Sequence, residues 1–152
     1  MHPLFIRTVS TIHRPLVDDA QEVGTRYALC PRADIALLIN GKSNFRVCSF
    51  DGINGHVEFS GDWAEFRASF GDEFIDINIV SDEGDPPGVE AAVRIDTICK
   101  VVFIENDRFA TLHLSDELAC SGMYGILPGR PSQVRIDLGS YKVLEEVLAG
   151  WH

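Results

Sequence analysis

Apolar and polar side chains alternate with a period of two through much of the segment 35–80. Every second residue is apolar in four runs, which cover residues 44–50, 56–60, 63–70 and 74–80. Strict alternation is typical of β-strands with one face on a core and the other in water. Short glycine-containing turns separate the runs: Asn40-Gly41, Asp51-Gly52, Asn54-Gly55, Gly61-Asp62 and Gly71-Asp72. Because such turns connect neighbouring antiparallel strands, the segment is predicted to form a meander of about five strands.

The pattern continues beyond residue 80. After a Pro- and Gly-rich loop at 81–88, strands are predicted at 89–95, 98–105, 109–114 and 133–138. The run Cys99–Ile104 is apolar on both faces, which predicts a central strand that is covered on both sides. A weaker, helical pattern covers Leu16–Gly24.

The clearest helix is predicted at the end of the chain. Val143, Val147 and Trp151 recur every four residues and form one apolar stripe. Ser140 is the expected N-cap, and Gly150 is expected to end the helix. The predicted fold is therefore mainly β, a β-sandwich or barrel-like antiparallel meander with a C-terminal helix, or an α+β arrangement.

Length and composition are those of one single globular domain spanning residues 1–152, because 45% of the residues are hydrophobic. The four cysteines are scattered, so no zinc-ligand spacing exists, and all four are expected to be buried free thiols. No signal peptide and no long apolar run is visible, which favours a cytoplasmic location and no membrane partner. No cofactor and no metal site is expected. The cysteines are Cys30, Cys48, Cys99 and Cys120.

Acidic residues are concentrated in the second half of the chain. Residues 1–70 carry 8 acids and 7 bases, whereas residues 71–152 carry 15 acids and 6 bases. Such a field repels phosphate backbones and attracts basic surfaces, so we expect a basic protein partner and no nucleic acid. The candidate partner-binding residues are six carboxylates in one stretch: Asp72, Glu73, Asp76, Asp82, Glu83 and Asp85.

A second candidate site is the polar face of the predicted meander. If the hairpins pair as their turns suggest, His56, Glu58, Glu65 and Arg67 point to the same side. A histidine beside carboxylates and an arginine could perform acid–base chemistry. The same residues also suit the solvated face of an antiparallel sheet. No catalytic motif is present, so no catalytic residue is assigned and an enzyme is the less favoured interpretation.

Three functional hypotheses follow. The leading hypothesis is a small acidic inhibitor that covers a basic surface, as bacterial immunity proteins or antitoxins cover toxic nucleases. The second is a small-ligand-binding protein or enzyme that uses the His56, Glu58 and Arg67 face. The third is a structural assembly subunit, in which exposed strand edges pair with another chain. The oligomeric state is not predicted.

Overall fold

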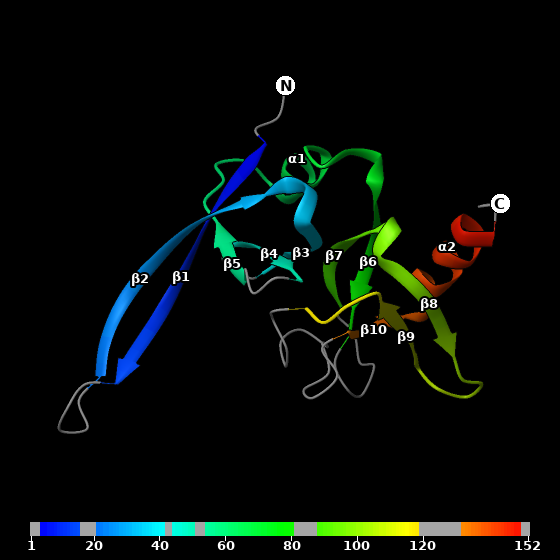
Figure 1. Ribbon diagram of the computed structural model, residues 1–152. Helices are drawn as coiled ribbons and strands as arrows, with labels where there is room; N and C mark the ends of the chain where they lie inside the picture. Colours follow the sequence, from blue (N-terminus) through cyan, green and yellow to red (C-terminus); the bar gives the residue numbers. More distant parts are fainter. Residues whose placement is uncertain are drawn as a thin grey trace.

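A computed structural model describes residues 4–15, 21–41, 44–50, 54–80, 88–118 and 132–149. Within these ranges, ten strands form one antiparallel sheet (Figure 1). The strands are β1 (Phe5–Pro15), β2 (Gln21–Pro31), β3 (Ile35–Asn40), β4 (Phe45–Ser49), β5 (Asn54–Val57), β6 (Phe74–Ile79), β7 (Val89–Arg94), β8 (Ile98–Phe103), β9 (Phe109–Leu114) and β10 (Gln133–Asp137). Two α-helices, α1 (Trp63–Ala68) and α2 (Leu138–Ala149), and three 3-10 turns, η2 (Arg32–Asp34), η3 (Gly71–Glu73) and η4 (Ile95–Thr97), complete the described structure.

The strands follow the order β2-β1-β5-β4-β3-β7-β6-β10-β9-β8. The central strand β3 is buried at its first five positions and separates two hydrophobic clusters. Leu37 and Ile39 belong to the larger cluster, which extends over β6, β7, β9, β10 and α2. Leu38 belongs to the smaller cluster, which also contains Phe66, because successive side chains of a strand point to opposite faces. The prediction of a mainly β fold with a C-terminal helix is confirmed, in an α+β arrangement.

Helix α2 packs on the larger cluster through the fully buried Leu144, with Val147 packed against the same cluster. The predicted stripe is only partly confirmed, because Val143 is 46% exposed and Trp151 lies outside the described residues. The N-cap differs from the predicted one, because the Asp137 carboxylate accepts a hydrogen bond from the Ser140 backbone N–H at 2.7 Å. Ser140 lies in the first turn instead, and its hydroxyl accepts the Asn78 backbone N–H at 2.8 Å. This contact ties the start of α2 to β6. Neither described helix has the length and apolar character needed to cross a membrane.

The predicted strand at 63–70 is wrong, since this segment contains helix α1. The Asp62 side chain accepts the Glu65 backbone N–H at 2.9 Å and so caps the helix. Phe66 is the buried residue of the helix, and its ring stacks on that of Phe45 with centroids 4.9 Å apart. The apolar residues at 64, 66 and 68 therefore do not share one buried face, as they would in a strand.

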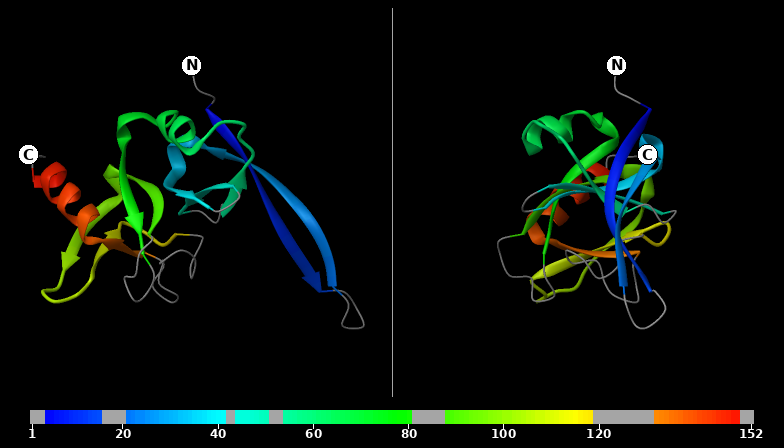
Figure 2. Two further views of the ribbon diagram at one scale, coloured as in Figure 1. Left: turned by 180° about the vertical axis from the view of Figure 1, so that it is seen from behind. Right: turned by 90° about the vertical axis from the view of Figure 1, so that its left-hand side faces the viewer.

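Strands β1 and β2 form a long hairpin that the sequence analysis missed. We call this hairpin the arm (Phe5–Pro31). Its pairing runs from Phe5 opposite Pro31 to Pro15 opposite Gln21. The arm projects away from the rest of the sheet in Figure 1 and in the left view of Figure 2. The helix predicted at 16–24 is wrong for residues 21–24, which belong to β2. Residues 16–20 lie outside the described residues.

Strand β8 occupies the other end of the sheet from the arm (Figure 1). It pairs with β9, and no second neighbour is recorded within the described ranges. The prediction of a central, covered strand at Cys99–Ile104 is therefore wrong. The loop expected at 81–88 falls outside the described residues except for Gly88.

Candidate functional site

The arm carries a row of exposed apolar side chains on one face. Val23, Tyr27 and Leu29 lie at odd-numbered positions of β2, and 63%, 61% and 66% of their surfaces are exposed. Residues separated by an even number of positions on a strand share a face. The three side chains therefore form one apolar row, which we call the arm row. Grouped exposed apolar side chains often mark a binding surface on a soluble protein.

The root of the arm is fixed to the body of the protein. Ile6 and Cys30 are buried in the smaller core cluster, and Thr8 is buried beside them. Val9 pairs with His56 of β5, and this pair joins the arm to the next strand of the sheet. The outer arm is thus a two-stranded ribbon in the part of the chain that the structure describes. Such ribbons are marginally stable in water without a third strand or a packing partner.

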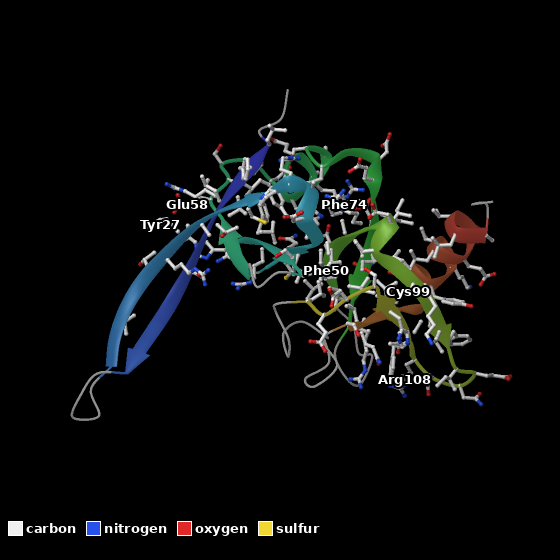
Figure 3. The ribbon with its side chains drawn as sticks, in the orientation of Figure 1. Tyr27, Phe50, Glu58, Phe74, Cys99 and Arg108 are labelled. Atoms are coloured by element: carbon white, nitrogen blue, oxygen red, sulfur yellow. The ribbon has the colours of Figure 1, made fainter. Side chains whose placement is uncertain are left out.

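Polar contacts hold the exposed face of the arm at its root. The Arg7 guanidinium lies 5.3 Å from the centroid of the Tyr27 ring. Arg7 also donates to the Glu58 carboxylate at 3.2 Å. Figure 3 shows Tyr27 and Glu58 close together where the arm leaves the body. The aromatic member of the arm row is thereby oriented by contacts within the chain.

Two of the six predicted partner-binding carboxylates form ion pairs with arginines of the same chain. Glu73 accepts from Arg94 at 2.6 Å, and Asp76 accepts from Arg67 at 2.7 Å. Asp72 is exposed on η3. The remaining three residues of the set, Asp82, Glu83 and Asp85, lie outside the described residues. Two of the three described carboxylates are therefore neutralised by arginines of the same chain.

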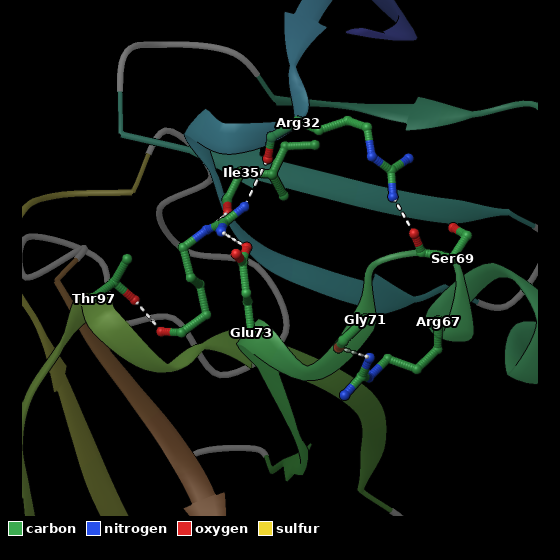
Figure 4. A network of polar contacts seen from close by, with 8 residues as sticks. Arg32, Ile35, Arg67, Ser69, Gly71, Glu73 and Thr97 are labelled. Carbon is green, nitrogen blue, oxygen red and sulfur yellow. Dashed lines mark hydrogen bonds and ion pairs between the residues drawn. The ribbon is translucent and has the colours of Figure 1, made fainter. Parts of the chain in front are cut away.

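Three arginines connect the segments around these carboxylates (Figure 4). Arg94 is 8% exposed and donates to the backbone oxygens of Ile35 at 2.8 Å and Arg32 at 2.7 Å, in addition to its pair with Glu73. The Arg32 guanidinium donates to the backbone oxygen of Ser69. Burial, together with the nearby charge of Arg94, lowers the pKa of Arg32. These arginines serve to hold η2, α1 and η3 together.

Arg67 anchors the end of α1 in the same way. Its guanidinium donates to the backbone oxygens of Gly71 at 3.0 Å and Phe74 at 2.8 Å, besides its pair with Asp76. Gly71 has a φ angle of 75°, in the left-handed region that favours glycine. The turn between α1 and β6 is therefore built around this arginine.

The second predicted site, at His56, Glu58, Glu65 and Arg67, is not assembled as expected. Its residues lie on different elements, since Glu65 and Arg67 belong to α1 while His56 belongs to β5. Glu58 pairs with Arg7, and Arg67 is occupied by Asp76. The prediction assumed that residues 63–70 form a strand, and the helix removes that assumption.

A groove of about 900 Å³ lies between α1 and α2 over β6 and β7. Several of its polar lining groups already have partners. Arg67 and Asp76 pair with each other, Asp137 caps α2, and the Ser140 hydroxyl accepts from Asn78. These groups stabilise the attachment of the two helices. Among the described residues, no group of three or more His, Cys, Asp or Glu side chains could hold a metal ion.

The cysteines differ from one another in their surroundings. Cys30 is a free, buried thiol, and burial, assisted by the charge of Asp34, raises its pKa. Cys99 is free but exposed on β8, and Cys48 is buried and disulfide-bonded. The expectation of buried free thiols therefore fails at Cys99 and Cys48. Cys120 lies outside the described residues.

No model of a known protein family matches the sequence, and no curated protein matches it. A solved structure is similar over 91% of this chain and 96% of its own length, with a TM-score of 0.49 and 10% sequence identity. It is a LytTr DNA-binding domain from a Bacillus cereus protein described as a methyl-accepting/DNA response regulator.

This comparison corrects the leading hypothesis. The similar structure is described as a DNA-binding domain and not as an immunity protein, an antitoxin or another toxin inhibitor. The prediction of an inhibitor that docks on a basic partner is therefore withdrawn, as is the exclusion of nucleic acid as a partner. At this identity and TM-score, the likeness assigns no function to the present chain.

The sequence did contain a signal for the arm. The alternating pattern of Val23, Thr25, Tyr27 and Leu29 indicates a strand. That these side chains are exposed could not be predicted, because alternation alone does not tell which face of a strand is buried.

Proposed function

We propose that this protein is a self-associating subunit whose arm docks on a second copy of the chain. The observation that carries the proposal is the exposed arm row of Val23, Tyr27 and Leu29 on a ribbon that projects from the body. Docking would remove this apolar surface from water and would supply a packing partner for the outer arm, beside which the described residues place no third strand.

The construction of the root favours the same role. Buried side chains fix the inner arm to the core, so the apolar row is presented on a positioned element. An ordered docking element loses less conformational entropy on binding than a disordered one. The strands at the two ends of the sheet, β2 and β8, each have one side with no partner strand within the described structure, and that side offers backbone N–H and C=O groups to another chain.

The test is the molar mass of the protein in solution. Sedimentation velocity over a series of micromolar concentrations is expected to show a mass that rises above the 16.8 kDa of one chain. The arm variant Tyr27→Thr/Leu29→Thr keeps residues that favour strands but removes the exposed apolar groups, so it should remain a monomer.

The matched control is Val143→Thr, which removes an apolar side chain that is 46% exposed on α2, away from the arm. This variant should associate like the natural chain. Circular dichroism should show the same fold for all three proteins. An arm variant that associates as strongly as the natural chain would overturn the proposal, and so would a natural chain that stays monomeric.

A further inference from the structure

Strand β8 lies at the edge of the sheet, but its side chains are mostly apolar, as in a strand that is covered by neighbours. Val102 is 37% exposed, Phe103 is 40% exposed, and Ile104, directly after the strand, is 62% exposed. One side of the strand pairs with β9, from Ile98 opposite Leu114 to Phe103 opposite Ala110. No strand is recorded on its other side among the described residues.

Natural edge strands are usually blunted by lysines, prolines or bulges. The first half of β8 follows this rule, because the register shifts between Ile98 and Lys100. The second half does not, since Val101, Val102 and Phe103 pair in regular register and carry no charge. A strand that is apolar on both faces is typical of one covered by neighbours. The amino-acid composition of β8 is therefore typical of a strand that pairs with a second strand in addition to β9.

The two ends of the sheet differ in charge. Residues 5–31, the arm, contain three arginines and three acids, whereas residues 95–149 contain eight acids and five bases. Among the arm side chains that the structure describes, Arg7 and Arg26 are the charged ones, and both are exposed. Contact between two β8 ends would bring negative charge together. Contact between an arm and a β8 end would not, because the acids and bases of the arm are equal in number. Figure 3 shows how far apart these ends lie, with Tyr27 on the arm and Cys99 on β8.

We propose that the β8 edge of one copy receives the arm of a second copy in a head-to-tail contact. The unpaired edge of β2 continues the sheet beside β8, and the arm row lies near Val102 and Ile104, whose even spacing places them on one face. The eleven residues of β2 are long enough to cover the six residues of β8. Because each copy keeps one free arm and one free β8 edge, the contact repeats into a ring or a chain of subunits.

This inference rests on the proposed self-association, and mixing two variants separates the two ideas. The edge variant Val102→Thr/Ile104→Thr removes apolar groups from β8 and leaves the arm intact. The arm variant Tyr27→Thr/Leu29→Thr does the reverse. Each variant alone is expected to associate at least about tenfold more weakly than the natural chain, which corresponds to 1.4 kcal/mol. Their mixture should form a one-to-one complex, because one partner still has an arm and the other still has an edge.

Each other outcome identifies what failed. Association of the edge variant at natural strength, with a monomeric arm variant, would show that the arm docks elsewhere and would overturn the β8 assignment alone. A mixture that stays monomeric, although both variants are folded, would overturn the head-to-tail contact. An arm variant that associates at natural strength would overturn the proposed function itself.

Discussion

Arg94 shows how one side chain organises several segments of this chain. Its guanidinium joins β7 to η2, β3 and η3 through Arg32, Ile35 and Glu73. The Phe74 ring lies beneath it, with the guanidinium carbon 4.7 Å from the ring centroid. A buried cation is stabilised only when hydrogen bonds replace its lost water, and these contacts supply that replacement.

Arg94→Met is therefore expected to destabilise the protein by about 2–4 kcal/mol, since it leaves buried backbone oxygens without donors. Urea unfolding at neutral pH measures this loss. The matched control is Arg7→Met, whose ion pair with Glu58 is exposed and contributes less than about 1 kcal/mol. Equal effects of the two substitutions would show that the Arg94 contacts add no stability of their own.

The two free thiols that the structure describes report on different parts of the molecule. Cys30 is buried and its pKa is raised, so little reactive thiolate forms there. Cys99 is exposed on β8. Iodoacetamide is expected to modify Cys99 in the folded protein and Cys30 only after unfolding.

Modification of Cys99 should also slow as the protein concentration rises, because a docked arm covers the β8 edge. Mass spectrometry of timed samples gives both rates. A Cys99 rate that is independent of concentration, in samples where sedimentation shows association, would place the contact away from β8. The edge variant offers the control, since its Cys99 should react at one rate throughout.

At the scale of elements, the strands and helices that could be predicted from the sequence are those with one buried face and with turn or cap residues at their ends. Strands at 45–49 and 74–79 follow from alternation between glycine turns, and helix α2 follows from its apolar stripe. Helix α1 was misassigned because its six residues alternate like a strand. Its better signal was Asp62 followed three residues later by Glu65, the pattern of a capped helix start.

The cap of α1 can be tested directly. Asp62→Ala removes the acceptor of the Glu65 N–H and is expected to cost about 1 kcal/mol. Asp72→Ala, at an exposed residue of η3, is the control and should cost less than about 0.5 kcal/mol. Urea unfolding of the two variants makes the comparison, and equal midpoints would show that the cap does not stabilise α1.

The ion pairs of the predicted carboxylates could not be read from the sequence, because they join elements that are distant along the chain. Two of the predicted carboxylates are bound by arginines, and one of these, Arg94, lies 21 residues from Glu73. A local count of charge cannot include such distant partners. The position of β8 was misjudged in the same way, because its composition indicates a covered strand but does not tell whether the cover comes from the same chain.

At the scale of the whole molecule, association and stability are coupled. A contact that forms between folded chains and is absent from unfolded ones stabilises the fold by mass action. Burial of the arm row would supply such a contact, since the row is exposed in the single chain. The melting temperature of the natural chain should therefore rise with protein concentration.

The size of this rise follows from the affinity. At a concentration about 100 times the dissociation constant, the gain is about 2.7 kcal/mol, which corresponds to roughly 5–10 °C for a chain of this length. Scanning calorimetry at several concentrations measures it, with Val143→Thr as the control that should show the same slope. The arm variant should melt at one temperature throughout, because its folded chains do not bind one another. A natural chain whose melting temperature is independent of concentration would mean that the arm row stays exposed, and self-association would no longer account for it.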